Sequence, residues 1–414
     1  MVPARIAPAD LADWLPVGGR VLVTGVTGES VLLAEAVMNA GDAIGPATFT
    51  GIFIPGINHH TYLANAGCKV ETFFVTAPLK PELGLRVMHL PLCYNDIRNR
   101  LRSIPIDALL CMVAPPDAAG HCSFGVAVDF AAELWPDIPI RIAHINPLMP
   151  RTPGDAGIPF AELTAYVEGG QPVGGPIDTK TDPVAEAIAA HVAPWIGDGA
   201  TLQTGLGKIP GAILRALTGR RNLRVHSGLL VEEVVDLLEA GALAPGRSVV
   251  AGVAVGSDRL MRAITGPEFD FQPVAVTHDV SRIAAIPDFV AINSALEVDL
   301  LGQAYSEVGP KGLMSGPGGA FDYAAAARQS GGLRIVALQS ATTGGTHSRI
   351  VVPGAPRGPV ALGRMDIDVI ATEHGAVDVR ALSYDGRAEA LISIAAPQFR
   401  VPLAEGWRTY AAQL

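Results

Sequence analysis

Short runs of apolar and β-branched residues that end on glycine turns alternate with helical patterns along the whole chain of 414 residues. The segment 21–25 (VLVTG) predicts a buried strand and a turn, and the spacing of Leu33 and Val37 predicts a helix that ends at Gly41. Apolar strands that alternate with amphipathic helices are typical of parallel sheets covered on both faces. We therefore predict an α/β fold.

The alternation restarts once along the chain. The other runs that predict strands are 108–114, 141–145, 201–204, 223–226, 249–255, 274–277, 335–338 and 369–372. The segment 171–181 (QPVGGPIDTKT) is polar and rich in glycine and proline, which predicts a linker before a helix capped by Asp182. We therefore expect two open-sheet domains, 1–180 and 181–414, with ligands bound beyond the carboxyl ends of their strands.

A regular helix is expected after the strand 223–226. Its apolar positions fall at i, i+3, i+4 and i+7, and a glycine follows them: Val231, Val234, Val235, Leu238 and Gly241.

The composition argues against several classes of protein. The chain has 30 Lys and Arg against 40 Asp and Glu, a formal net charge of −10, and this disfavours nucleic-acid binding. No segment reaches the ~18 apolar residues of a membrane span, and residues 1–13 do not resemble a signal peptide, so we expect a cytoplasmic protein. The four cysteines are far apart, which predicts free thiols and no metal site.

Two glycine turns are candidates for binding an anion or a developing oxyanion. Gly205-Leu206-Gly207 follows a predicted strand and precedes a helix, where backbone N–H groups are available. The segment 315–323 (SGPGGAFDY) places Gly318 and Gly319 where a backbone can approach a ligand closely. Each turn is also compatible with a purely structural role, in the second case with Asp322 capping a helix.

Carboxylates and histidines outside these turns offer weaker candidates. Glu297 and Asp299 alternate on one face of a predicted strand, which is typical of a solvated face and also compatible with an acid/base pair. His347 and the pair His59-His60 lie in predicted loops, where a histidine is either exposed or catalytic.

Several separated motifs, in this order, resemble those of the acetyl-CoA hydrolase/transferase family. This class of family I CoA-transferases includes the 4-hydroxybutyrate CoA-transferases, and the resemblance covers nearly the whole chain. The motifs are 114–117 (APPD) with 120–129, 204–210, 293–303, 315–323, 372–375 (TEHG) and 387–399.

The resemblance implies two similar α/β domains of the NagB/RpiA-like type, with the active site between them and usually a homodimer. It implies acyl-CoA esters as substrates, a carboxylic acid or water as the second reactant, and no metal or redox cofactor. By position, Gly205 and Gly207 would polarise the thioester oxygen, and Gly318 and Gly319 would line the acyl or CoA site.

The residue that the family uses as its nucleophile is missing. Family members carry a glutamate that attacks the thioester and then holds CoA covalently. Here the matching segment reads His226-Ser227-Gly228, with Gly228 at the glutamate position. The asparagine of the family's Asn-His-Pro turn corresponds to His278. Glu232 and Glu233 follow, but we expect them to begin a helix and to point elsewhere.

The changed site suggests changed chemistry. One hypothesis is a hydrolase, or a lyase that breaks a carbon–carbon bond in a CoA ester, with His278 as general base and His226 or Glu29 as helpers. A second is a CoA-transferase that uses a displaced carboxylate such as Glu232. A third is a non-catalytic acyl-CoA-binding subunit.

Overall fold

The computed structural model describes residues 2–175, 182–309, 312–356 and 358–414. The chain forms two compact units. The first contains residues 1–177, 228–230 and 249–277, and the second contains residues 178–227, 231–248 and 278–414. The predicted boundary at 180/181 and part of the predicted linker, residues 176–181, lie outside the described residues, so the domain limits remain a prediction.

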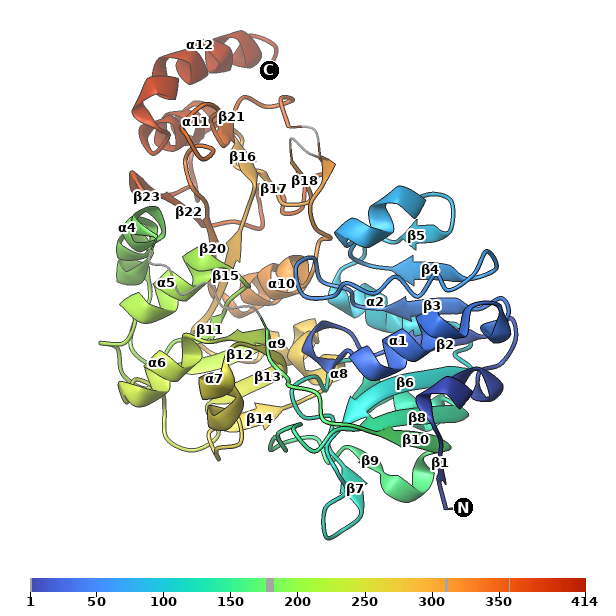
Figure 1. The fold of residues 1–414 in the computed structure, drawn as a ribbon. Helices are drawn as coiled ribbons and strands as arrows, with labels where there is room; N and C mark the ends of the chain where they lie inside the picture. The colour runs from blue at the N-terminus through green and yellow to red at the C-terminus, as the bar shows by residue number, and fades with distance from the viewer. Residues whose placement is uncertain (1, 176–181, 310–311, 357) are drawn as a thin grey trace. The chain divides into compact units, whose positions relative to one another are not determined.

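The first unit is built on an eight-stranded parallel sheet with the order β1-β10-β8-β6-β2-β3-β4-β5 (Figure 1). Its strands are β1 Ala4–Arg5, β2 Arg20–Val23, β3 Thr48–Gly51, β4 Lys69–Thr72, β5 Val87–His89, β6 Ala108–Val113, β8 Ile140–Ile145 and β10 Ala165–Glu168. The strands predicted at 21–25, 108–114 and 141–145 are confirmed, with ends that shift by one or two residues.

Helices and short strands complete the first unit. They are α1 Val31–Ala40, α2 Tyr94–Ser103, α3 Ala131–Leu134, α7 Asp258–Ala263 and α8 Val274–Thr277, the parallel pair β13 Val249–Val255 and β14 Phe269–Phe271, and the antiparallel pair β7 His121–Cys122 and β9 Ile158–Pro159. The 3-10 helices are η1 Pro8–Trp14, η2 Val26–Gly28, η3 Gly41–Ile44, η4 Ala77–Glu82, η5 Trp135–Asp137 and η6 Phe160–Glu162.

The α1 helix shows how local chemistry sets the first βα unit. The Ser30 hydroxyl accepts a hydrogen bond from the Leu33 N–H and caps the helix start, and Gly41, with φ +54°, ends it. Leu33 and Val37 are buried, as their spacing predicted. The turn between β2 and α1 therefore has a fixed geometry.

In the second unit, six strands follow the order β12-β11-β15-β20-β22-β23, all parallel except the last pair. They are β11 Thr201–Gln203, β12 Arg224–Val231, β15 Phe289–Ser294, β20 Leu333–Ala337, β22 Val369–Thr372 and β23 Gly375–Asp378. The short strands are β16 Glu297–Asp299, β17 Ala304–Tyr305, β18 Val308–Gly309, β19 Gly312–Leu313 and β21 Ile350–Val351. The helices are α4 Pro183–Val192, α5 Lys208–Ala216, α6 Val234–Glu239, α9 Val280–Ala284, α10 Ala320–Ser330, α11 Tyr384–Ser393, α12 Arg400–Ala411, η7 Ala193–Trp195 and η8 Pro397–Phe399.

Two elements differ from the sequence predictions. Residues 274–277 form α8 and not a strand, because Pro273 fits a first helical turn and its carbonyl accepts the N–H groups of Val276 and Thr277. The helix predicted from Val231 begins only at Val234, because the apolar run 229–231 continues β12. As a result, Gly228 lies inside a strand and not between a strand and a helix.

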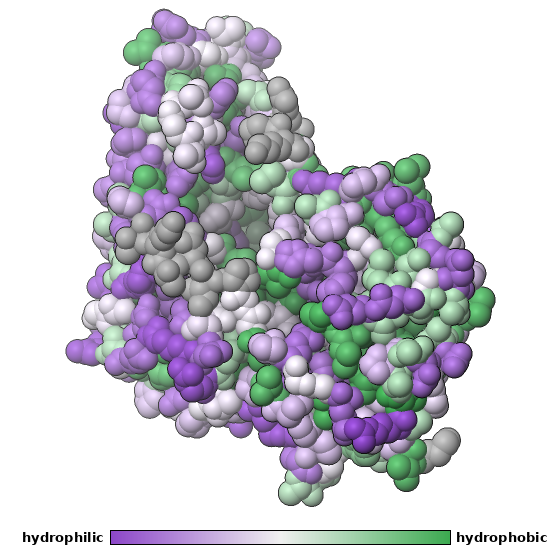
Figure 2. All heavy atoms as spheres, in the orientation of Figure 1, coloured by the Kyte–Doolittle hydropathy of each residue, from purple (hydrophilic) through white to green (hydrophobic). Residues whose placement is uncertain are grey.

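The state of the cysteines agrees with the free thiols predicted from their spacing. Cys68, Cys111 and Cys122 are buried and Cys93 is half-buried, all as free thiols. Within the described residues, no helix has the length and apolar character needed to cross a membrane. Figure 2 shows hydrophilic and hydrophobic residues interspersed over the face in view.

Candidate active site

Glu29 is a buried carboxylate at the turn between β2 and α1. It is 6% exposed, and both of its oxygens accept hydrogen bonds. Asn58 Nδ2 lies 3.0 Å from Oε2, and the Tyr62 hydroxyl lies 2.9 Å from Oε1. A buried carboxylate needs such partners. The structure therefore places one predicted site residue in a defined polar cluster, Glu29 with Asn58, His60 and Tyr62.

Asn58 joins this cluster to the backbone. Its Oδ1 accepts the N–H groups of Val26 and Ile54 at 3.2 and 2.8 Å, and its Nδ2 also donates to the Val26 carbonyl at 3.0 Å. One side chain thus holds the βα turn, the following loop and the carboxylate together. The sequence offered no signal for this, because the contact joins residues about thirty positions apart.

Tyr62 closes the cluster from its other side. It is 1% exposed, and its ring centroid lies 5.3 Å from that of Phe53 and 5.4 Å from that of Phe49. Burial, together with the nearby Glu29 charge, raises its pKa well above the usual value, so the phenol remains a donor to the carboxylate. Its φ of +58° is unusual for a side chain of this size and holds it in this position.

His60 contacts the same carboxylate. Its Nδ1 lies 3.6 Å from Glu29 Oε2, and its side chain remains 22% exposed. The interaction with Glu29 raises the pKa of the imidazole, and the Glu35 charge adds to the effect, although partial burial acts in the opposite direction. Of the two alternatives predicted for this loop histidine, an exposed position does not describe it.

His278 has the opposite environment. It lies between α8 and the Asp279 cap of α9 and is 3% exposed. Burial, and then the proximity of His226 on β12, lowers the pKa of His278 to about 3. The imidazole is therefore neutral at physiological pH, and a base of this pKa accepts a proton from water poorly. The expectation of a base with a near-neutral pKa does not fit this site.

Gly319 lies directly against the His278 ring. A Cβ on Gly319 would be 2.8 Å from the Nε2 and Cδ2 atoms of His278 and 2.9 Å from the Tyr323 ring. The His278 and Tyr323 ring centroids are 4.9 Å apart, and Gly318 takes a φ of +63° just before α10. Gly319 is thus needed for close packing beside a predicted catalytic histidine, and Gly318 supplies the positive φ of the turn. Asp322 lies in the first turn of α10 and is not its cap.

The turn 205–207 leaves open space around its backbone. A Cβ at Gly205 or Gly207 would have no neighbour within 4 Å, and Gly207 takes a φ of +124° immediately before α5. Ser227 Oγ donates to the Thr204 carbonyl at 2.9 Å and ties this turn to β12. An exposed glycine turn at a helix N-terminus is compatible with binding an oxyanion, and that role stays a prediction from the sequence.

The carboxylates after Gly228 do not form an obvious substitute for the missing nucleophile. Glu232 lies in the turn between β12 and α6. Glu233 occupies the N-cap position of α6 without a side-chain capping bond, and its Oε1 lies 2.8 Å from Nη1 of Arg215, which ties this carboxylate to α5.

Two further carboxylates of the second unit are buried. Asp299 is fully buried and accepts bonds from the Tyr305 hydroxyl at 2.9 Å and Gln303 Nε2 at 2.8 Å, so the predicted solvated face is wrong at this position. The reason is that the chain turns back after Asp299 to pair with β16, and the side chains of Gln303 and Tyr305 on this returning segment reach the carboxylate. Glu307 is 5% exposed, and burial raises the pKa of its carboxyl.

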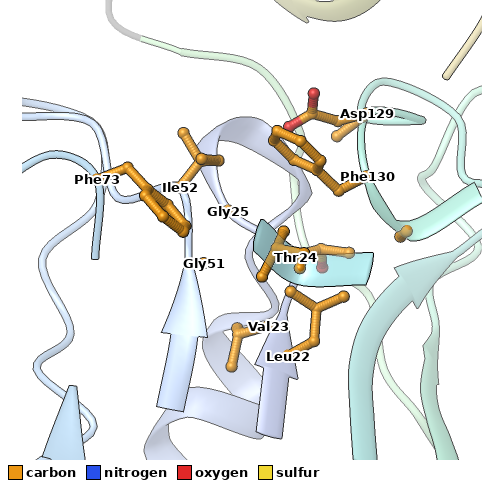
Figure 3. A pocket seen from close by; sticks show the side chains of 12 residues that line it. Leu22, Val23, Thr24, Gly25, Gly51, Ile52, Phe73, Asp129 and Phe130 are labelled. Carbon is orange, nitrogen blue, oxygen red and sulfur yellow. The ribbon is translucent and has the colours of Figure 1, made fainter. Parts of the chain in front are cut away.

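A narrow cavity lies at the carboxyl ends of β2 and β3 (Figure 3). Its volume is about 20 Å³, which suits a water molecule and not an acyl chain. Asp129, Phe130 and Phe73 are among its lining residues. Burial raises the pKa of Asp129 to about 7, and its φ is +34°.

Comparison with known proteins identifies the family. Residues 256–406 match the acetyl-CoA hydrolase/transferase C-terminal domain. The chain is 35% identical over 312 residues to the 4-hydroxybutyrate coenzyme A transferase of Clostridium kluyveri, which covers 73% of this chain and 72% of that protein. It is 32% identical over 414 residues to the butyryl-CoA:acetate CoA-transferase of Anaerostipes caccae, covering 94% and 91%.

The solved structures agree. RipA from Yersinia pestis matches with a TM-score of 0.91 at 28% identity, over 99% of this chain and 98% of RipA. The predicted α/β fold class and the predicted resemblance are therefore confirmed. This chain belongs to the acetyl-CoA hydrolase/transferase family, a family of enzymes that act on acyl-CoA thioesters.

Proposed function

We propose that this enzyme hydrolyses a small or medium acyl-CoA to free coenzyme A and a carboxylic acid, with water in place of the carboxylate nucleophile of its relatives. The observation that carries the proposal is Gly228, which offers no side chain at the position where the resemblance expects the nucleophilic glutamate. The alternative reaction is cleavage of a carbon–carbon bond in the CoA ester. Analysis of the products distinguishes it from hydrolysis.

Two other carboxylates of the chain support the proposal because their geometry suits other roles. Glu233 is paired with Arg215, and Glu29 is buried with both oxygens hydrogen-bonded. A carboxylate held in this way is a poor nucleophile, because attack would break the bonds that keep it buried. Glu29 is better suited to orienting another group.

The glycine turns keep the role that the resemblance gives them. The open backbone at Gly205 and Gly207 would stabilise the thioester oxyanion, and Gly318 and Gly319 would line the acyl or CoA site. His278 would act as a neutral hydrogen-bonding group, in keeping with its lowered pKa. His226 would maintain that neutral state through its proximity.

The names of two relatives, a 4-hydroxybutyrate coenzyme A transferase and a butyryl-CoA:acetate CoA-transferase, favour a second candidate function, CoA transfer between carboxylic acids. Glu307 is a buried carboxyl with a raised pKa, and its backbone carbonyl accepts the N–H groups of Met314 and Ser315 at the start of the second glycine turn. Glu307 and Glu232 are the candidates for a nucleophilic carboxylate that stands at another position than Gly228.

The test is a turnover assay with a panel of acyl-CoAs, with and without excess acetate, combined with borohydride trapping. Release of free coenzyme A that does not depend on acetate, with no trapped adduct, is expected. Acetate-dependent CoA exchange with a trapped glutamyl thioester mapped to Glu307 or Glu232 would overturn hydrolysis in favour of transfer. Tight acyl-CoA binding with neither reaction would identify a binding subunit.

We also propose a cytoplasmic homodimer. The free state of all four cysteines supports a reducing compartment, and the resemblance supports the dimer. Light scattering of the purified chain tests the oligomeric state, since a monomeric mass would contradict it.

A further inference from the structure

We propose that the side-chain carbonyl of Gln203 holds the water that attacks the thioester. The inference rests on the proposed hydrolytic function and names the residue that places its second reactant. Gln203 is the last residue of β11, two positions before Gly205, and both residues belong to the second unit. The group that holds the water and the glycine turn proposed for the thioester oxygen therefore lie in one compact unit.

The Gln203 side chain carries a buried acceptor that lacks a donor. The residue is 4% exposed, and within the described part of the chain no donor group hydrogen-bonds its Oε1 atom. A buried acceptor in this state is unfavourable, because it has lost its contacts with water and gained none in the protein. Such groups are rare in native proteins, and an O–H group of a bound reactant would satisfy this one.

The pairing of the strands shows which face of the sheet Gln203 points to. Thr201 pairs in parallel with Arg224 of β12. Gln203 and His226 each follow two residues later, so their side chains share one face of the sheet. On the other side of β11, Gln203 pairs with Ala291 of β15. Gln203 thus lies between His226 and Ala291 on the same face.

The helices α9 and α10 cover this face. Ala291 packs in one buried apolar cluster with Ile283 of α9 and Tyr323 of α10. The centroid of the Tyr323 ring lies 4.9 Å from that of His278. His278 is also close enough to His226 for the two imidazoles to interact electrostatically. The two histidines and the aromatic ring thus form a layer against this face of the sheet.

The layer lies next to the second glycine turn. A Cβ on Gly319 would be 2.8 Å from the Nε2 and Cδ2 atoms of His278. In the proposed function Gly319 lines the acyl or CoA site, so the Gln203 carbonyl lies on the side of the sheet where that site is expected. A Cβ on Gly205 would have no neighbour within 4 Å, which leaves room for a reactant beside the end of β11.

An amide carbonyl orients a water molecule but does not deprotonate it. It accepts a hydrogen bond from one O–H of the water and leaves a lone pair of the water oxygen for the attack. The amide is neutral and does not titrate in the pH range in which an enzyme works. Gln203 is therefore a positioning residue, which raises kcat by holding the nucleophile and does not set the pH limits of the reaction.

The experiment compares Gln203→Met with the parent enzyme, using the acyl-CoA of the panel that is turned over fastest. Methionine is a flexible, unbranched side chain like glutamine but has no strong acceptor. We expect kcat for CoA release to fall by about 10–10²-fold with KM within about twofold, because the water loses its orienting contact. The melting temperature should rise, because an apolar group replaces a buried amide whose carbonyl has no donor. The pH profile should keep its limits.

Ser248→Ala is the matched control in the same unit. The Ser248 Oγ atom is also buried without a hydrogen-bond partner among the described residues, but it directly precedes β13 and lies at the amino end of that strand. This variant should keep the kcat of the parent enzyme and should lose no stability. The pair thus separates removal of an unsatisfied polar atom from removal of the contact to water.

Three results would overturn the inference. A Gln203→Met enzyme that keeps kcat within about threefold of the parent would show that the carbonyl holds no reactant. A lower melting temperature together with a lower kcat would show that the amide is structural. A raised KM with unchanged kcat would show that it binds the acyl-CoA and not the water. In each case, acetate-independent CoA release by the parent would leave hydrolysis standing, whereas its absence would contradict the proposed function.

Discussion

The first unit holds a histidine beside a carboxylate, and the second holds a histidine beside another histidine. His60 faces Glu29, and its pKa is raised, whereas His278 lies near His226, and its pKa falls to about 3. The two histidines also differ in burial. The His60 side chain is 22% exposed, whereas the whole His278 residue is only 3% exposed. The environment of His60 thus favours the charged imidazolium, and the environment of His278 favours the neutral imidazole.

The comparison teaches that the partner and the depth of burial set the chemistry of a histidine. A neighbouring carboxylate stabilises the imidazolium, while burial and a second imidazole destabilise it. Neither factor is visible in the immediate sequence of either histidine.

The largest effect is expected from Glu29→Ala. Removal of the carboxylate leaves the buried donors of Asn58 and Tyr62 without their acceptor, and we expect the free energy of unfolding in urea to fall by about 3 kcal/mol. A loss of less than about 0.5 kcal/mol would show that the cluster does not depend on the carboxylate.

The stability that Glu29 contributes through His60 is expected to decrease as the pH rises. Because the folded-state pKa of His60 is raised from 6.5, the Glu29–His60 contribution is fully present below pH 6.5 and is lost as the pH rises through the raised value. Glu29→Gln should therefore be most destabilising at acidic pH, relative to the parent protein.

The next effect is expected from Gly319→Ala. The added Cβ would lie 2.8 Å from the His278 ring, so the ring or the turn must move, and we expect a loss of about 1–3 kcal/mol in unfolding free energy together with reduced kcat. Gly197→Ala is the control, since a Cβ there would have no neighbour within 4 Å. Equal stability of the two variants would contradict the close packing of the second site.

A smaller effect is expected from His278→Gln, measured as unfolding free energy against pH. Between pH 6.5 and about 3 the unfolded chain binds a proton that the folded protein does not, so the parent protein loses stability as the pH falls through this window. The variant lacks this group, and its stability should fall less steeply. Parallel curves for the two proteins would mean that His278 is not held neutral.

The smallest effect on stability is expected from Asp129→Asn. Asp129 lines the narrow cavity of the first unit. The folded protein keeps a proton on this carboxyl up to about pH 7, whereas the unfolded chain releases it near 3.8, so stability falls as the pH rises between these values. Differential scanning calorimetry should show a higher melting temperature for the variant at pH 8 and little difference at pH 4. A lower melting temperature at pH 8 would contradict the account of this carboxyl.

Much of the fold follows from the sequence because apolar runs and glycine turns are local signals. The strand at 108–114, the Asp182 cap and the Gly41 stop were predicted on that basis, and the structure contains all three. Two predictions failed at places where β-branched residues are compatible with both a strand pattern and a helix pattern. Residues 274–277 follow a proline that starts a helix. Val231 continues a strand, although its spacing from the later apolar residues predicts a helix.

The site was harder to predict because its contacts are tertiary. Glu29 was selected from its position after a strand, but its partners Asn58 and Tyr62 carry no motif. His60 was noticed only as a loop histidine, since nothing in the loop sequence indicates a carboxylate thirty-one positions away. Likewise, no local pattern shows that His278 is buried beside Gly319.

The central claim is that water replaces the missing carboxylate nucleophile, and a single turnover in ¹⁸O-water tests it most directly. With enzyme in excess over acyl-CoA, we expect the released carboxylic acid to carry the ¹⁸O and every glutamate and aspartate peptide of the protein to remain unlabelled. Incorporation of ¹⁸O into a peptide that contains Glu307, Glu232 or any other carboxylate would show that the acyl group passes through the enzyme, and it would contradict the account.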